Sequence, residues 1–251
     1  MTRIAVISDI HGNAYAFEKV IAEINGESFD HVVCLGDAVQ GGPQPAETVA
    51  LLRDLGWPVV MGNADEWLLA GVETGRDPIP EVRLRKLQRM REWSLSKLSS
   101  ADRAFIAAFR LIVEIPLDDG RNLLCFHGSP GSFDDIILPT TPETEFQAHL
   151  APYLPNIMCG GHTHLQHLRR IGASDSFYFN PGSVGRPKDG DHRAAYAVWR
   201  AGEFVLKKTD YEWERVTRQL AAIFPPEIAR RLQAPLMERD FRASSAHHDS
   251  E

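Results

Sequence analysis

The N-terminal stretch RIAVISDIHGN, residues 3–13, combines the two signals that decide the fold. Its apolar half, Arg3 to Ser8, is short and is typical of a buried strand. Asp9 and His11 follow this strand directly, and both are residue types that commonly bind metal ions. In α/β proteins, ligand sites lie just beyond the carboxyl ends of the strands. The stretch therefore predicts an α/β sheet with a polar site at one edge.

The alternation of strands and helices continues as far as residue 62. The spacing of apolar residues predicts a helix from Ala14 to Ile24, and a second apolar run predicts a strand from His31 to Leu35. A helix is expected from Pro45 to Leu55, with proline at its start and Gly56 just beyond its end. A third strand is expected from Pro58 to Met61. Such strand–helix–strand units imply right-handed crossovers and a parallel sheet.

Residues 65–110 have no strand pattern, and they predict a helical insertion over one edge of the sheet, with helices at Glu81–Leu98 and Ala101–Phe109. Beyond it, Asp119-Gly120 and Ala201-Gly202 predict two hairpins. The strands expected in this half are Leu111–Pro116, Asn122–Phe126, Asn156–Cys159, His167–Ile171, Phe177–Phe179, Ala194–Arg200 and Phe204–Lys208. Helix is expected from Glu212 to Leu236, broken at Pro225-Pro226. We predict one domain over residues 1–240, a mixed two-sheet sandwich with helices outside, and a polar tail at 241–251.

Composition narrows the range of functions. The chain has 251 residues, enough for one sizeable core, and a formal net charge of −7. An acidic chain is not expected to bind nucleic acid stably, because that binding depends on Lys and Arg. No apolar run is long enough for a signal peptide or a membrane span, so we expect a cytoplasmic protein without membrane contact. Its oligomeric state is left open. Cys34, Cys125 and Cys159 lie in apolar runs and are expected to be reduced and buried.

Five successive strands end in side chains that bind metals. These residues are Asp9, His11, Asp37, Asn63, His127, His162 and His164. In an extended segment, residues two apart point the same way, so Asp9 is expected to converge with His11, and His162 with His164. A mixture of imidazole and carboxylate ligands favours Mn, Fe, Zn, Co or Ni over Ca or Mg. The pattern predicts a transition-metal site at the edge of the sheet.

Each of these residues also has a simpler explanation when it is taken alone. An aspartate after a strand is usually a turn or helix cap, and a lone histidine is usually a hydrogen-bonded surface or core residue. For all seven residues, these simpler explanations would have to hold at five consecutive strand ends at once, so taken together they explain the pattern less well than a metal site does. The remaining histidines lack this setting and are expected to be structural or solvated: His31, His149, His167, His192, His247 and His248.

The order of these motifs resembles a known family. Asp9-x-His11, Gly36-Asp37, Gly62-Asn63, His127 and Gly161-His162-x-His164 are similar to the motifs of the calcineurin-like metallophosphoesterase superfamily. The segment at 180–185 also resembles a stretch in the small prokaryotic phosphodiesterases of that superfamily. The resemblance implies a four-layer αββα sandwich that hydrolyses phosphate esters with a hydroxide bridging two metal ions.

The resemblance also implies a ligand set. One metal would be held by Asp9, His11, Asp37 and His164, and the second by Asp37, Asn63, His127 and His162, with Asp37 bridging. The expected cofactors are two divalent ions about 3.5 Å apart, Mn²⁺ first, with Fe, Ni, Co or Zn as alternatives. Asp37, Asn63 and His127 are the candidate catalytic residues. Asn13 is a fourth candidate, beside the ligands or facing the substrate.

One position departs from the family pattern. The third motif usually reads Gly-Asn-His-Asp or Gly-Asn-His-Glu, whereas here it reads Gly62-Asn63-Ala64-Asp65. The family's histidine is assigned to protonating or stabilising the leaving oxygen, and the methyl group of Ala64 can do neither. We therefore expect this chain to prefer esters with good leaving groups. Asp65 has lost its family partner and is expected to cap a helix beginning at Glu66.

Two further polar segments bear on the substrate site. The cations at 83–91 either recruit phosphate or form a solvated helix face, and the solvated face is favoured. They are Arg83, Arg85, Lys86, Arg89 and Arg91. Asp134 and Asp135 extend the loop after His127, which is expected to line the substrate cleft.

The predicted function is a dinuclear metal-dependent phosphodiesterase acting on a small nucleotide-like or aryl phosphate diester. A Ser/Thr-type protein phosphatase and a dinucleoside polyphosphate hydrolase are the alternatives within the enzyme class, because a fold does not define a substrate. A non-catalytic binding module of the same fold is the alternative outside it. A module without catalytic demand can lose ligands, whereas all seven are present here.

Overall fold

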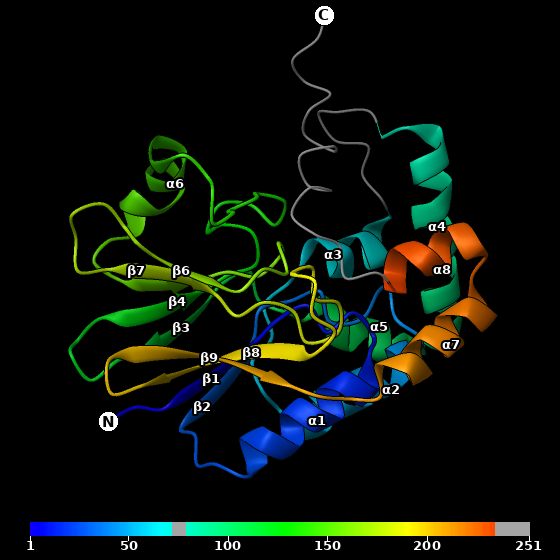
Figure 1. Cartoon of the computed structure of the whole chain (residues 1–251), viewed down its shortest axis with the longest axis horizontal. Coiled ribbons are helices and arrows are strands. Elements are labelled where there is room, and N and C mark those ends of the chain that lie inside the picture. The colour runs from blue at the N-terminus through cyan, green and yellow to red at the C-terminus, as the bar shows by residue number, and fades with distance from the viewer. Residues whose placement is uncertain (72–78, 234–251) are drawn as a thin grey trace, which may run out of the picture.

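Two mixed β-sheets lie face to face at the centre of the molecule, and helices cover their outer faces (Figure 1). The structure is a computed structural model and describes residues 1–71 and 79–233. Its layers follow the order helix, sheet, sheet, helix, as the sequence predicted. Most of what lies between the sheets is aliphatic, as expected for strands that are buried on both faces.

The first sheet has the strand order β2-β1-β8-β9 and joins the two ends of the described chain. Its strands are β1 (Ile4–Ile7), β2 (His31–Cys34), β8 (Ala194–Arg200) and β9 (Glu203–Thr209). β1 pairs in parallel with β2 and antiparallel with β8. The carboxyl ends of β1 and β2 therefore lie at the same edge of the sheet.

The second sheet has the order β3-β4-β5-β7-β6. Its strands are β3 (Val113–Pro116), β4 (Asn122–Cys125), β5 (Ile157–Cys159), β6 (His167–Arg170) and β7 (Phe177–Asn180). β4, β5 and β7 are parallel neighbours. Their carboxyl ends also share one edge. The hairpins predicted at Asp119-Gly120 and Ala201-Gly202 are both confirmed as antiparallel pairs.

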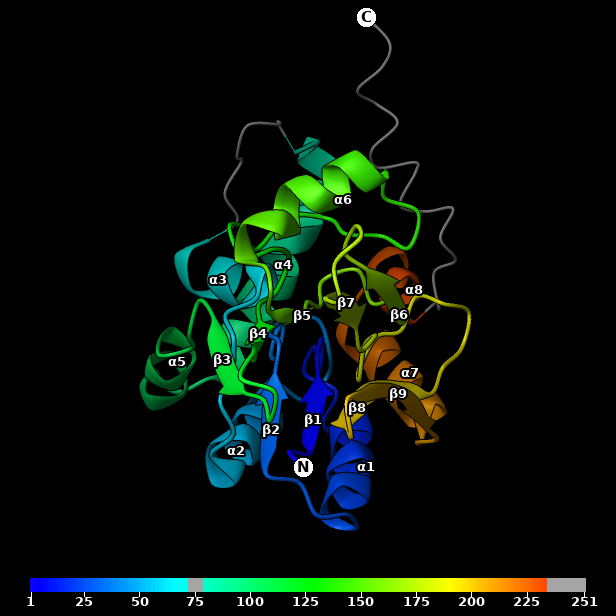
Figure 2. The same ribbon diagram turned by 90° about the vertical axis from the view of Figure 1, so that its left-hand side faces the viewer.

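Helices of unequal extent cover the two sheets (Figure 2). α1 (Ala14–Asn25) and α2 (Pro45–Leu55) pack on the first sheet, where Phe17, Val20 and Leu52 are fully buried. α6 (Glu143–Leu150), followed by a 3₁₀ turn at Ala151–Tyr153, covers the second sheet. The sequence analysis did not predict α6, because its buried face consists of only Phe146 and Leu150.

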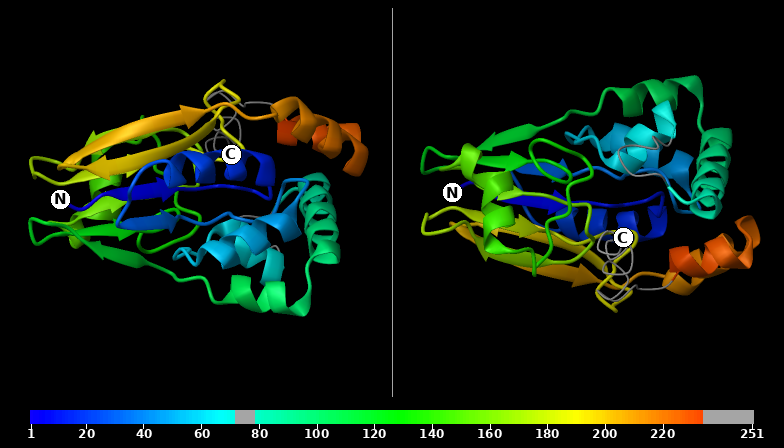
Figure 3. Two further views of the ribbon diagram at one scale, coloured as in Figure 1. Left: turned by 90° about the horizontal axis from the view of Figure 1, so that it is seen from below. Right: turned by 90° about the horizontal axis from the view of Figure 1, so that it is seen from above.

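The insertion and the C-terminal segment form helices at the same end of the molecule (Figure 3). The insertion contains α3 (Asn63–Ala70), α4 (Glu81–Lys97) and α5 (Ser100–Ala107), and the C-terminal segment contains α7 (Trp213–Ile223) and α8 (Pro226–Gln233). Met90 of α4 packs in one cluster with α7 and α8, and the Trp93 and Phe224 rings meet edge to face at 5.4 Å. Helices from distant parts of the sequence thus support one another.

One expectation from sequence needs correction. The third strand, predicted at Pro58–Met61, is reduced to two parallel bridges, Val59 with Cys34 and Val60 with Arg110, because the chain enters α3 at Asn63. The insertion also contributes to the core: Leu68, Leu98 and Ile106 pack with residues of α1 and α2, so the insertion extends the outer helical layer. The predicted helix at 234–236 and the tail at 241–251 lie outside the described residues.

Two other expectations concern burial. Cys34, Cys125 and Cys159 are all buried thiols without a disulfide, as predicted. Across residues 1–71 and 79–233, no helix combines the length and the apolar character needed to cross a bilayer.

Candidate metal centre

The seven predicted metal ligands come together at the seam between the two sheets. Asp9 and Asp37 follow strands β1 and β2 of the first sheet, whereas His127 and His162 follow strands β4 and β5 of the second. Six of the seven side chains are buried, and His162 is half-buried. They form two sets that share Asp37, and we name these sets after Asp9 and His127.

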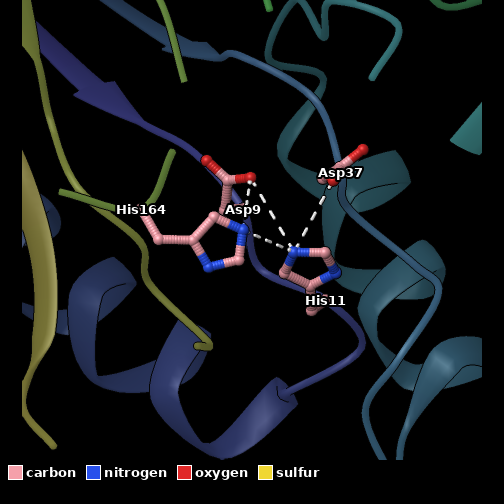
Figure 4. A group of neighbouring side chains, drawn as sticks. All are labelled: Asp9, His11, Asp37 and His164. Carbon is pink, nitrogen blue, oxygen red and sulfur yellow. Dashed lines mark hydrogen bonds and ion pairs between the residues drawn. The ribbon is translucent and has the colours of Figure 1, made fainter. Parts of the chain in front are cut away.

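The Asp9 set consists of Asp9, His11, Asp37 and His164, which point toward one another (Figure 4). His164 Nε2 lies 3.2 Å from Asp9 Oδ1 and 3.1 Å from His11 Nε2. His11 Nε2 lies 3.6 Å from Asp37 Oδ2. Four potential ligand atoms therefore surround one point, with nitrogen and oxygen in equal number.

The His127 set consists of Asp37, Asn63, His127 and His162. His127 Nε2 lies 3.4 Å from Asp37 Oδ1 and 3.1 Å from Asn63 Oδ1. His162 Nδ1 lies 3.0 Å from the same Asn63 oxygen. Asp37 thus faces the Asp9 set with one carboxylate oxygen and the His127 set with the other.

Backbone carbonyl groups orient three of the four imidazoles. His11 Nδ1 donates to Gln40 O at 2.7 Å, His127 Nδ1 donates to Leu35 O at 2.7 Å, and His164 Nδ1 donates to the carbonyl of Arg186. A carbonyl oxygen can only accept, so these contacts place the proton on Nδ1 and the lone pair of a neutral ring on Nε2. Outer hydrogen bonds of this kind are typical of histidines that bind metals.

The donor set fits a divalent cation. No hydrogen-bond donor reaches the buried Asp9 Oδ1 among the residues that the structure describes. Beside this oxygen, the Nε2 atoms of His11 and His164 face each other at 3.1 Å, although both are acceptors in the neutral form. Converging buried lone pairs without a donor are unfavourable, and a metal ion would satisfy all of them.

Burial and neighbouring charges set the protonation of the site. Burial opposes ionisation of Asp9, but His164 and His127 outweigh it and lower the pKa of Asp9 well below its usual value. At Asp37 too, burial opposes ionisation, but His127 outweighs this effect and lowers the pKa of the carboxyl group. Burial lowers the pKa of His162 to about 4 and that of His164 to about 3, and Lys188 contributes to both shifts. These two imidazoles are therefore neutral at pH 7, which is the form that binds metal.

The backbone at the ligands is left-handed rather than extended. Five of the seven have positive φ angles: Asp9 (55°), His11 (49°), Asp37 (49°), His162 (68°) and His164 (63°). The expectation that paired ligands converge by strand alternation is therefore wrong in its reason. Asp9 and His11 do converge, in the Asp9 set, whereas His162 and His164 belong to different sets. A non-glycine residue in this region costs about 1–2 kcal/mol, and such strain is concentrated at functional sites.

Hydrogen bonds between the loops hold this strained backbone in place. Asp9 N donates to Gly36 O at 3.0 Å, His11 N donates to Asp37 O at 2.8 Å, and Gly185 N donates to Asp9 O at 3.0 Å. Glycine is required where these loops touch. A Cβ atom on Gly62 would clash with the backbone nitrogen and Oδ1 of Asp37. The loops therefore position one another, and the strain is distributed over the whole edge.

Two residues that the sequence analysis considered have supporting roles. The Asn13 side chain caps α1 by accepting from Ala16 N at 3.1 Å, and it donates to Gly185 O at 3.0 Å. We assign it to positioning these loops rather than to catalysis. The helix that Asp65 was expected to cap begins at Asn63 rather than Glu66, and Asp65 caps it from its third position by accepting from Gly62 N at 3.4 Å. Its buried carboxylate accepts from Ala38 N at 3.0 Å and so fixes the loop after Asp37.

A cleft of about 350 Å³ opens from the metal centre. Its floor contains His11, Asp37, Asn63, His162 and His164. Its walls come mainly from α3, α4, α8 and the loop between β7 and β8. The wall residues are Gln40, Ala64, Trp67, Arg83, Lys86, Leu87, Met90, Asp134, Ile136, Arg186, Lys188, Ile228 and Leu232. A concave, partly apolar cleft beside a cluster of polar groups is typical of a small-molecule site.

The cations at 83–91 divide between cleft and surface. Arg83 and Lys86 line the cleft, whereas Arg85 pairs with Glu81 on the exposed face. Arg91 donates to the carbonyl groups of Trp67 and Leu68 near the end of α3. The interpretation of the whole segment as a solvated helix face is therefore incomplete.

Asp134 and Asp135 also have different environments. Asp134 lines the cleft, whereas Asp135 accepts from Ser129 Oγ and pairs with His149.

None of the other histidines that the structure describes belongs to either ligand set. His167 packs on Tyr178, and His192 stacks on Trp213 at 4.1 Å. His247 and His248 lie outside the described residues. Sequence reasoning missed Arg186 and Lys188, although the run Gly185-Arg186-Pro187-Lys188 follows a family-like segment and could have drawn attention to them.

Comparisons with known proteins agree with this arrangement. Over 226 residues the chain is 26% identical to uncharacterized protein MJ0912 of Methanocaldococcus jannaschii, covering 84% of this chain and 88% of the relative. The crystal structure of a metallophosphoesterase from Sphaerobacter thermophilus matches with a TM-score of 0.73 at 24% identity, covering 94% of this chain and 99% of that one. Hypothetical protein PH1004 from Pyrococcus horikoshii OT3 matches with a TM-score of 0.79 at 20% identity, with the same coverage.

The similarity to these solved structures shows a shared fold. The model of the calcineurin-like phosphoesterase superfamily domain matches residues 2–202, which include all seven predicted ligands and end before α7 and α8. The chain belongs to the calcineurin-like phosphoesterase superfamily.

Proposed function

We propose that this chain is a dinuclear metal-dependent phosphodiesterase that hydrolyses small nucleotide-like or aryl phosphate diesters. The observation that supports this most directly is the position of Asp37. Its two carboxylate oxygens face two different donor sets, each of which also contains imidazoles. A shared carboxylate is the arrangement expected for two metal ions that act on one phosphate group.

Two divalent ions held by these sets would lower the pKa of a bound water from ~15.7 towards ~7 and offset charge on the phosphate. The protein's own residues prepare the place. The two carboxylates, Asp9 and Asp37, cancel only part of the charge of two such ions, so an anionic ester is attracted although the chain carries −7 overall. Arg186 and Lys188 on the cleft wall strengthen this attraction. Mn²⁺ is the proposed native metal, since imidazole and carboxylate together suit it.

The leaving oxygen receives no proton from the third motif. Ala64 lines the cleft directly after Asn63, and its side chain carries no proton donor. An alcohol with a low pKa can depart as an anion without such help. This favours aryl esters and phosphoanhydride-like groups over simple alkyl esters.

The competing functions fit less well. The cleft is enclosed by α4 and α8, and its volume of about 350 Å³ suits a small ester better than a segment of a folded protein. This disfavours a protein phosphatase. A non-catalytic module has no need to keep seven ligands, five of them in strained conformations. A dinucleoside polyphosphate hydrolase remains compatible with the cleft.

The proposal is tested by a matrix of metals and substrates. Protein stripped with a chelator is reloaded with Mn²⁺, Ni²⁺, Co²⁺, Zn²⁺ or Mg²⁺ and assayed on bis(p-nitrophenyl) phosphate, p-nitrophenyl phosphate and nucleotides. We expect the highest kcat/KM for the diester with Mn²⁺, and two bound metals per chain by elemental analysis. Hydrolysis that survives metal removal, or no hydrolysis with any metal, would overturn the proposal.

A further inference from the structure

The connection from β7 to β8 carries the chain from the second sheet to the first, beside the metal centre. We name its first part, residues 181–186, the crossing segment. Its backbone lies along the end of β1, where Val184 N donates to Ser8 O at 2.9 Å. Such backbone contacts do not depend on the side chains. Ser183, however, adds side-chain contacts that reach the loop of Asp9.

The Ser183 hydroxyl group is fully buried and makes two hydrogen bonds. It donates to Asp9 O at 2.8 Å and accepts from Arg186 N at 2.7 Å. The carbonyl group of Arg186 in turn accepts from His164 Nδ1. One hydroxyl group therefore connects the backbone of one ligand in the Asp9 set with the residue that orients another.

Both ligands at the ends of this connection have strained backbones. The φ angles of Asp9 and His164 are 55° and 63°, and the two side chains point toward each other (Figure 4). Such conformations persist only where the surrounding structure holds them. The bond from Ser183 to Asp9 O restricts the rotation that would release Asp9. The bond from Arg186 N holds in place the residue whose carbonyl group orients the His164 ring.

The His127 set is held by other groups. His127 Nδ1 donates to Leu35 O at 2.7 Å, and the buried Asp65 carboxylate accepts from Gly62 N at 3.4 Å, beside the ligand Asn63. Neither contact involves the crossing segment. The two donor sets thus have separate supports although they share a carboxylate.

We propose that Ser183 is a positioning residue that sets the metal affinity of the Asp9 set and leaves that of the His127 set unchanged. This inference rests on the two donor sets of the proposed function. Without the hydroxyl group, Asp9 O keeps one hydrogen bond fewer and Arg186 N loses its acceptor, so the donors of Asp9 and His164 converge less well. Outer partners of metal ligands typically contribute about 10–100-fold to affinity.

Metal binding, measured apart from activity, tests this role. Equilibrium dialysis of chelator-stripped protein over a range of free Mn²⁺ concentrations, followed by elemental analysis, gives the dissociation constants. We expect two bound ions per chain in the wild type. In Ser183→Ala, one constant should rise at least about tenfold and the other by less than about twofold.

Ser176→Ala is the matched control. Ser176 lies just before β7, is 1% exposed and donates to Pro155 O at 2.7 Å. This variant also loses a buried hydrogen bond to a carbonyl group, but away from the metal centre, so both constants should stay unchanged. Ser183→Cys keeps the size of the side chain and offers a weaker donor, so it should weaken the same site by less. It replaces Ser183→Ala in the titrations if that variant does not fold.

Ligand variants identify which site is weakened. His164→Ala removes a ligand of the Asp9 set, and in that background Ser183→Ala should not change the affinity of the remaining site. His162→Ala removes a ligand of the His127 set, and there Ser183→Ala should still weaken the remaining site by at least about tenfold. Such a comparison isolates the coupling between two residues.

An equal loss of affinity at both sites in Ser183→Ala would overturn the inference. Unchanged affinities in this variant, or the same loss in Ser176→Ala, would also overturn it. The proposed function fails separately: a wild type that binds both ions and hydrolyses no bis(p-nitrophenyl) phosphate would refute it and leave the role of Ser183 standing.

Discussion

The loops that carry the seven predicted ligands meet the α4–α8 wall, formed by Leu87, Met90, Ile228 and Leu232, in one cleft, but the two regions are built in different ways. The loops leave buried strands of both sheets, hold five ligands at positive φ, and bond to one another through backbone groups. The wall consists of two helices without strained residues at the cleft, which come from the insertion and from a segment beyond the family domain. In the proposed enzyme, the loops would therefore define the chemistry, and the wall would define which ester reaches it.

This difference predicts how the two regions respond to mutation. A change in the loops should alter metal binding and the reaction of every substrate. A change in the wall should alter the choice of substrate and leave the metals in place. The following variants test that separation, beginning with the largest expected effect.

Replacement of the shared ligand should have the largest effect. Asp37→Asn removes the charge that both donor sets use, so activity should fall more than about 100-fold, beyond the loss seen when only an outer partner of a ligand is removed. Elemental analysis should show fewer than two bound metals. His192→Ala, which only breaks a ring stack with Trp213, should keep both metals. An Asp37→Asn protein that retains two metals and full activity would contradict the assignment.

Ala64 should control the dependence on the leaving group. The wild type should cleave nitrophenyl diesters far faster than alkyl esters, because no side chain at this position assists the leaving oxygen. Ala64→His should speed the poor leaving groups, by up to about 10²-fold, at the low end of the usual contribution of a general acid. Rates over a series of aryl diesters measure the slope for both proteins. A flat series in the wild type would show that another group already provides the acid.

Removal of Phe224, which packs between α4 and α8, should weaken substrate binding more than it changes the metal content. Phe224 is 4% exposed and packs on Trp93, so Phe224→Ala should destabilise the protein by about 3 kcal/mol. We expect KM for aryl diesters to rise several-fold while two metals remain bound. Chemical denaturation, kinetics and elemental analysis measure the three effects. Loss of the metals in this variant would remove the distinction between loops and wall.

The backbone strain at the ligands predicts that glycine and alanine variants differ in stability with opposite signs at His11 and His127. In the presence of a chelator, His11→Gly should be more stable than His11→Ala by about 1 kcal/mol, because only glycine adopts positive φ without cost. His127 does not have a positive φ. There the glycine variant should be less stable than the alanine variant by about 0.5–1 kcal/mol. Urea denaturation of the four proteins tests this, and the same sign at both positions would refute it.

The smallest effect is expected in thiol labelling of the cysteines in the native protein. Burial raises the pKa of the Cys34 and Cys159 thiols well above the usual value, so the reactive thiolate is scarce. All three cysteines should react with a thiol reagent only as the protein unfolds. Rapid labelling of the native protein would show that one of them is accessible from the cleft.

The site was more predictable from sequence than its walls. Strand ends could be recognised because an apolar run followed by Asp9 or His127 is a local pattern, and both hairpins had local turn signals. The cleft depends on contacts between α4 (Glu81–Lys97) and α8 (Pro226–Gln233), which are far apart in sequence, so no local pattern reports them. The left-handed backbone at His11 was missed because strand alternation predicts the same convergence. α6 was missed because two buried residues, Phe146 and Leu150, make too weak a pattern.

The position of the donor sets at the seam between the sheets has a consequence for the lifetime of the protein. Each set joins residues of both sheets, such as Asp9 with His164, so a bound ion is also a cross-link between them. A ligand at 100 times its Kd stabilises the folded state by about 2.7 kcal/mol, which is a large part of a typical total of about 5–15 kcal/mol. When metal is scarce, the proposed enzyme would lose part of its resistance to unfolding and proteolysis together with its activity. Its abundance in a cell would then follow the metal supply.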